Sequence, residues 1–154
     1  MIILDTNLVS EPLKPLPPPG VVHWLNAQEP ATLFITSINL AELLAGVETM
    51  PQGKRRDALA QALANQVGAL FEDRVLNFDA RAAQCFAACL AGAQAQGNPV
   101  GFADCAIAAI AKSKGFMVAT RNVRDFLGTG VEVINPWALM SNEDPISLGK
   151  LSCP

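Results

Sequence analysis

The chain has 154 residues, which is long enough for one domain to bury a core without disulfides or structural metals. Hydrophobic residues make up 51% of the chain and charged residues 16%, which argues against a disordered protein. No apolar run approaches the roughly 20 residues of a membrane-spanning helix, so we expect no membrane association. A net charge of −3 excludes a globally basic nucleic-acid-binding protein. The opening lacks the basic region of a secretory signal, which predicts a cytoplasmic protein.

Short β-rich runs alternate along the chain with longer segments rich in alanine and leucine. The predicted strands, in chain order, are residues 2–4, 33–36, 75–78, 117–120 and 131–134. A short first helix follows the first strand, and the longer predicted helices are residues 38–47, 54–70, 81–96 and 102–114. Strands separated by helices form right-handed crossovers, so the pattern predicts an α/β fold with a mainly parallel sheet and helices on both faces.

Proline and glycine mark the connections between these elements. The proline-rich run 15–20 is predicted to be a stiff surface connection outside any helix or central strand. Gly115 is expected to cap the helix that precedes it. Residues 1–140 form the predicted single domain, and residues 141–154, which lack clear periodicity, are expected to be a peripheral or mobile tail.

Acidic residues gather where an open α/β sheet binds its ligands, beyond the carboxyl ends of the strands. Asp5 directly follows the first strand, and Glu42 lies just inside the helix after the second strand. Asp104 lies in the first turns of the helix before the fourth strand, and Asn122 and Asp125 follow that strand. Oxygen ligands without His or Cys favour Mg²⁺ or Mn²⁺ over zinc. An ion of this kind can activate water for phosphodiester hydrolysis.

Each acid also has a simpler structural interpretation. Asp5 could cap the helix that follows it, and Asp104 could interact with the dipole of its own helix. Glu42 points roughly 150° away from the apolar stripe of its helix and could be a solvated side chain. Together, however, the acids have few basic residues near them in sequence, and two carboxylates 4 Å apart repel by about 4 kcal/mol at an effective dielectric of 20. The cluster therefore favours a bound cation.

Four segments in register resemble the PIN-domain ribonucleases: residues 3–7, 37–43, 103–111 and 119–126. The likeness is strongest to the bacterial VapC toxins, and especially to their FitB-like group. The openings of that group resemble residues 5–12 and their ends resemble residues 135–137. The resemblance runs in order from Met1 to about Trp137.

The resemblance implies a PIN-like three-layer α/β/α sandwich around a central, mainly parallel sheet of four or five strands. It also implies an endoribonuclease that depends on Mg²⁺ or Mn²⁺, with Asp5, Glu42 and Asp104 as its catalytic and metal-binding acids. The fourth acidic position of the family falls at Asn122, where many relatives have Asp and others Asn. Asp125 is a candidate substitute for that missing carboxylate.

The resemblance assigns supporting roles to further residues. Thr120 would position metal-bound water, and Thr6 or Asn7 would orient the first acid. Arg121 and Arg124 are candidate phosphate contacts, and solvated charges at a helix end are an equally good interpretation of both.

The same resemblance implies partners. Toxins of this group are usually homodimers, and a small antitoxin whose C-terminal segment lies along the acidic groove neutralises them. DNA is bound only indirectly, through the antitoxin at its own promoter. A second interpretation is a catalytically weak PIN-fold protein that acts mainly by assembling with this DNA-binding antitoxin. Phosphatases that also begin with a strand and an Asp need a second Asp at position 7, where this chain has Asn7.

Overall fold

The sheet of the protein is built from five parallel strands in the order β3-β2-β1-β4-β5. The computed structural model describes residues 1–139. In chain order the strands are β1 (Ile2–Leu4), β2 (Leu33–Thr36), β3 (Val75–Leu76), β4 (Met117–Ala119) and β5 (Val133–Ile134). The central strand β1 pairs with β2 on one side and with β4 on the other. The predicted parallel sheet is confirmed.

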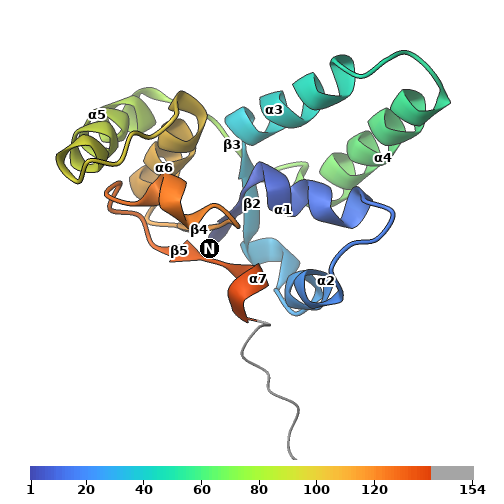
Figure 1. Cartoon of the computed structure of the whole chain (residues 1–154), viewed down its shortest axis with the longest axis horizontal. Coiled ribbons are helices and arrows are strands. Elements are labelled where there is room, and N and C mark those ends of the chain that lie inside the picture. The colour runs from blue at the N-terminus through green and yellow to red at the C-terminus, as the bar shows by residue number, and fades with distance from the viewer. Residues whose placement is uncertain (140–154) are drawn as a thin grey trace, which may run out of the picture.

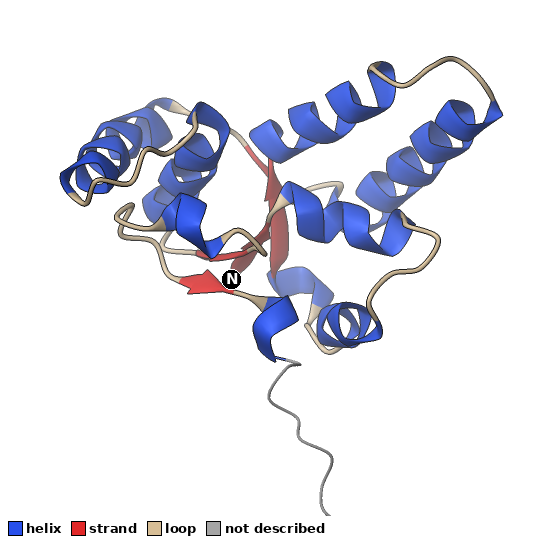
Figure 2. Cartoon of the chain, viewed as in Figure 1, coloured by secondary structure: helices blue, strands red, loops and turns tan. Residues whose placement is uncertain are grey.

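Helices cover both faces of the sheet (Figure 1). They are α1 (Thr6–Ser10), α2 (Pro19–Asn26), α3 (Ser37–Glu48), α4 (Lys54–Phe71), α5 (Ala80–Ala95), α6 (Phe102–Lys114) and α7 (Pro136–Leu139), with short 3₁₀ turns at η1 (Glu11–Leu13), η2 (Pro30–Thr32) and η3 (Val123–Phe126). The α3–α4 pair and the α5–α6 pair lie on opposite sides of the strands, which Figure 2 shows in red. This is the predicted three-layer α/β/α sandwich.

Alternation along the strands explains the two helical layers. Ile2 and Leu4 of β1 pack into the core shared with α3 and α4, whereas Ile3 packs into the core shared with α5 and α6. Successive side chains of a strand point to opposite faces, so a strand that is covered on both faces is apolar at every position. All three residues of β1 are accordingly buried.

The element boundaries marked by glycine and proline are partly as predicted. Gly115 caps α6 in the left-handed conformation, with φ of 69°, which confirms its expected role. The prediction for residues 15–20 is wrong at its end, because α2 already begins at Pro19. Proline suits the first turn of a helix, since its fixed φ is helical and its missing N–H would have no partner there.

One contact between layers depends on glycine. A Cβ on Gly92 of α5 would lie 2.4 Å from the carbonyl oxygen of Gly128, and a Cβ on Gly128 would lie 2.8 Å from Cα of Ala93. Gly128 also has a positive φ of 81°. The turn after η3 therefore packs directly on the backbone of α5.

No helix among residues 1–139 is long and apolar enough to cross a membrane. The predicted tail, residues 141–154, lies outside the described residues.

Candidate functional site

The carboxyl edge of the sheet brings polar side chains from three strands together. Asp5 follows β1, Thr36 ends β2 and Thr120 follows β4, and all three residues are buried. The backbone N–H of Asp5 donates to the carbonyl of Ala119 at 2.9 Å, which continues the pairing of β1 with β4 to the point where both strands end. The edge is therefore a fixed part of the sheet.

The Asp5 carboxylate is held on both of its oxygens. Oδ1 accepts a hydrogen bond from the backbone N–H of Thr6 at 2.8 Å, so Asp5 caps α1. Oδ2 accepts from Thr120 Oγ1 at 2.8 Å and from Asn7 Nδ2 at 3.5 Å. The Asp5 side chain is only 4% exposed, so a lost donor would leave a buried charge without compensation. Thr6 and Asn7 thus contact Asp5, and their role in orienting it for catalysis stays a prediction.

Glu42 is joined to this edge through Thr6. Glu42 is exposed on α3, and its Oε2 accepts a short hydrogen bond from Thr6 Oγ1. Thr6 Oγ1 in turn accepts from Asn39 Nδ2 at 3.1 Å. Asn39 is fully buried and forms a reciprocal capping box with Thr36 at the start of α3. Glu42 is thus solvent-exposed, as its position on the helix suggested, and yet directed toward the Asp5 region.

Asn39 and Thr36 are positioning residues that were not predicted from the sequence. Their signal was the Thr-x-x-Asn spacing before an apolar helix, which is a variant of the capping-box pattern. The pattern explains the local cap, but the long-range bond from Asn39 to Thr6 depends on the packing of α1 against α3.

Asp104 lies in the first turn of α6 and shares the electrostatic field of the other acids. Its pKa is raised from 3.8 to about 6, first by burial and then by the negative charges of Asp125, Asp5 and Glu42. A carboxylate whose ionised form is disfavoured in this way is stabilised by a nearby cation or by a proton. Asp125, Asp5 and Glu42 are therefore near enough to Asp104 for their charges to act on it.

The turn after β4 carries the remaining predicted residues. The backbone N–H of Asn122 donates to Thr120 Oγ1 at 3.0 Å, and the N–H of Asp125 donates to the carbonyl of Asn122 at 3.0 Å. The Thr120 hydroxyl therefore links this turn to Asp5. Asn122 is exposed, as are the candidate phosphate contacts Arg121 and Arg124.

The acids of the site have no ion-paired partner in the described part of the chain. The ion pairs among residues 1–139 are Lys14 with Glu11 and Arg56 with Glu48, and neither includes an acid of the site. The donor set, carboxylate and hydroxyl oxygens with uncompensated negative charge, fits a hard divalent ion. No three His, Cys, Asp or Glu side chains in residues 1–139 converge into a group that could hold a metal as they stand.

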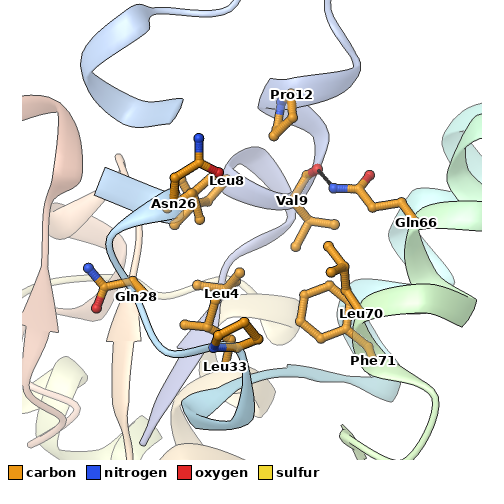
Figure 3. A pocket seen from close by; sticks show the side chains of 12 residues that line it. Leu4, Leu8, Val9, Pro12, Asn26, Gln28, Leu33, Gln66, Leu70 and Phe71 are labelled. Atoms are coloured by element: carbon orange, nitrogen blue, oxygen red, sulfur yellow. Dashed lines mark hydrogen bonds between the residues drawn. The ribbon is translucent and has the colours of Figure 1, made fainter. Parts of the chain in front are cut away.

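A groove of about 610 Å³ adjoins the acidic site. Thr6 and Glu42 line it, as do apolar side chains of α3 and α4 that include Leu43, Val47 and Leu63. A separate cavity of about 290 Å³ lies among β1, α1, α2 and α4 and is mostly apolar (Figure 3). In that cavity Gln66 Nε2 donates to the carbonyl of Val9 at 3.1 Å, and none of the four acids lines the wall.

A parallel α/β sandwich with acids at the carboxyl edge of its central strands defines the class of the protein. The chain belongs to the PIN-domain family, whose model matches residues 2–129. The VapC ribonuclease Y4jK of Sinorhizobium fredii is 43% identical over 89% of this chain and 98% of its own length. The toxin FitB of Neisseria gonorrhoeae is 39% identical over 89% of this chain and 99% of its own length.

The fold agrees with a solved relative. The crystal structure of FitAcB from Neisseria gonorrhoeae matches with a TM-score of 0.84 at 39% identity, covering 89% of this chain and 99% of that chain. The predicted PIN fold is confirmed.

Proposed function

We propose that the protein is a divalent-metal-dependent endoribonuclease that acts as the toxin of a toxin–antitoxin pair. The observation that carries this proposal is that burial and the charges of Asp125, Asp5 and Glu42 raise the pKa of Asp104, while none of these four acids is ion-paired among the described residues. The names of the related ribonuclease Y4jK and toxin FitB support the same class of activity.

Asp5, Glu42 and Asp104 would hold the ion, which we propose to be Mg²⁺ or Mn²⁺. Such an ion supplies charge stabilisation to a phosphodiester and lowers the pKa of water. Asn122 and Asp125 would add outer contacts to the ion. Because like charges repel, an ion shared by these carboxylates would offset the repulsion between them.

The chain's own groups prepare the site for this ion. The Thr120 hydroxyl and the Thr6 amide hold the Asp5 carboxylate in one orientation, and Thr6 and Asn39 direct Glu42 toward it. Charge-assisted hydrogen bonds of this kind hold the metal-ligating side chains in place before an ion binds. The side chains therefore lose less conformational entropy on binding. Arg121 and Arg124, exposed after β4, are proposed to contact phosphates of the RNA.

The proposed partner is a small antitoxin. The groove beside Glu42 has an apolar wall and is also lined by the basic residues Lys14 and Arg55, which suits a peptide segment that carries apolar side chains and charges of both signs. By the same proposal, the toxin forms a homodimer and meets promoter DNA only through the antitoxin.

A second candidate is a catalytically weak PIN protein that serves mainly to assemble with a DNA-binding antitoxin. Two observations favour it: Asn122 stands at the fourth acidic position, and residues 1–139 hold no ready group of three metal ligands.

An RNA cleavage assay separates the two candidates. Purified protein is incubated with structured and single-stranded RNA in Mg²⁺ or Mn²⁺, beside Asp5→Asn and Asp104→Asn variants and an Asp73→Asn control. Asp73 is exposed and precedes β3, at the opposite edge of the sheet. We expect cleavage by the wild type and the control that EDTA abolishes and that both site variants lose.

Equal cleavage by the wild type and the site variants would indicate a contaminating nuclease and contradict the proposal. No cleavage together with antitoxin-dependent DNA binding would establish the second candidate instead.

A further inference from the structure

One aromatic ring stands out on the surface next to the acidic site. Phe102, the first residue of α6, is 66% exposed and lies two residues before Asp104. It is the only aromatic side chain among residues 1–139 that is largely open to solvent. Exposing a phenyl ring forfeits the free energy of its burial, which for a side chain of this size is substantial.

The ring is supported from below by two other phenylalanines. Its centroid lies 5.4 Å from that of Phe86 on α5 and 6.4 Å from that of Phe78, which follows β3. Phe78 and Phe86 meet edge to face, with centroids 6.0 Å apart and planes at 89°. Such aromatic contacts hold a ring in place. Phe102 is therefore a fixed platform whose outer surface is free.

The platform belongs to the same edge of the sheet as the acids. The backbone N–H of Phe78 donates to Ser37 Oγ at 3.4 Å, and Ser37 is the first residue of α3, the helix that carries Glu42. Phe102 itself begins the helix that carries Asp104. The ring thus lies near the starts of α3 and α6, at the carboxyl edge of the sheet that also carries the acids.

The charge of the site favours a nucleobase as the occupant of this platform. Phosphates are repelled by the acids until an ion binds, and the chain as a whole carries a net charge of −3. Stacking of a base on an aromatic ring is uncharged and works for every base. Stacking therefore supplies affinity for RNA without bringing further negative charge close to the carboxylates.

We propose that Phe102 is the base-stacking residue of the site and positions single-stranded RNA beside Asp104. The inference rests on the proposed ribonuclease function and adds a substrate-binding group to it. Because stacking tolerates all bases, Phe102 contributes affinity and placement and does not select a sequence.

The test compares Phe102→Leu, which keeps an apolar side chain but removes the π face, with Phe102→Trp, which keeps it. Phe116→Leu is the matched control, since it makes the same substitution in a separate aromatic pair, Phe34 with Phe116, just before β4 and so at the opposite edge of the sheet. Steady-state cleavage of a short fluorogenic single-stranded RNA gives KM and kcat for each variant. Size-exclusion chromatography with light scattering gives the oligomeric state, and a thermal midpoint verifies folding.

We expect Phe102→Leu to raise KM by roughly 5- to 100-fold with kcat nearly unchanged, as loss of one stacked base predicts. Phe102→Trp should keep the wild-type KM, and its added tryptophan fluorescence should be quenched by RNA. Phe116→Leu should keep KM close to the wild-type value. A KM for Phe102→Leu within about twofold of the wild type overturns the inference. So does dissociation of an oligomer, which would make the ring a subunit contact.

If the wild type cuts no RNA, the proposed function fails by itself, and the stacking inference is then decided separately by RNA quenching of the Phe102→Trp variant. Quenching supports an RNA platform without catalysis, and its absence overturns the platform as well.

Discussion

Replacing Asp104 by Asn should stabilise the metal-free protein at neutral pH. The substitution keeps the shape of the side chain and removes the charge that burial and three neighbouring carboxylates disfavour. Ionising Asp104 requires more free energy in the folded state than in the unfolded state. At neutral pH the wild type is therefore less stable than the Asp104→Asn variant, and functional sites commonly reduce stability in this way.

The size of this effect follows from the pKa of Asp104. The pKa is 3.8 for an ordinary Asp and about 6 in the folded protein. Each pH unit between the two values is worth about 1.4 kcal/mol, which sets an upper limit of about 3 kcal/mol. Asp104 is only partly buried, and solvent screening reduces the expected gain to about 1–2 kcal/mol.

The stability difference between the wild type and the Asp104→Asn variant should depend on pH. Below about pH 4 Asp104 is protonated in both states, so the wild type and the variant should have similar stability. As pH rises from about 4 to about 6 the unfolded state releases its proton first, and the wild type loses stability relative to the variant. Above about pH 6 the difference stays constant.

Urea denaturation in EDTA across this range measures the difference, with Asp73→Asn as the control. We expect the free energy of unfolding of Asp104→Asn to exceed that of the wild type by about 1–2 kcal/mol above pH 6. A wild type that is equally or more stable than the variant at neutral pH would refute the argument that Asp104 shares its charge field with the other acids.

Three further predictions concern the site and its support. Thr120→Val should lower the free energy of unfolding by about 1–3 kcal/mol, because it removes a hydrogen-bond donor to the buried Asp5. Thr120→Ser keeps the donor and should leave the free energy of unfolding unchanged. Urea denaturation of both variants measures the difference. Gly128→Ala should destabilise the protein by about 1–3 kcal/mol, since the φ of Gly128 is positive and the added Cβ would meet α5. Gly68→Ala has open space around the added Cβ and should stabilise the protein by about 0.5–1 kcal/mol. Equal thermal midpoints for the two variants would contradict this pair of predictions. Saturating Mn²⁺ should raise the thermal midpoint of the wild type at about pH 7, and the gain should shrink toward pH 5 as the carboxylates bind protons; an unchanged midpoint would count against a shared site.

Much of the fold was predictable because it depends on local patterns. Apolar runs and alanine-rich segments located the strands and the main helices, and their alternation predicted the parallel sheet. The start of α2 at Pro19 differs from the prediction, because the proline-rich run 15–20 is not incompatible with a helix along its whole length. Proline at the first position of a helix obeys a different rule from proline inside one.

The candidate site was predictable only in part. Asp5 and Asp104 followed from the rule that ligands bind at the carboxyl edge of a parallel sheet. The bond from Asn39 through Thr6 to Glu42 joins residues that lie 33 and 36 positions apart, and no local pattern records it. The Thr120 hydroxyl donates to Asp5, and its expected role in positioning water stays a prediction. The exposure of Phe102 likewise depends on how α5 and α6 pack.

The most direct measurement is anomalous X-ray scattering at the manganese edge from crystals grown with Mn²⁺. We expect an anomalous peak coordinated by carboxylate oxygens of Asp5 and Asp104, with Glu42 joining them directly or through water, and no such peak in Asp104→Asn. A manganese ion bound elsewhere, or a well-ordered crystal with no peak near these carboxylates, would contradict the shared metal site and with it the proposed nuclease.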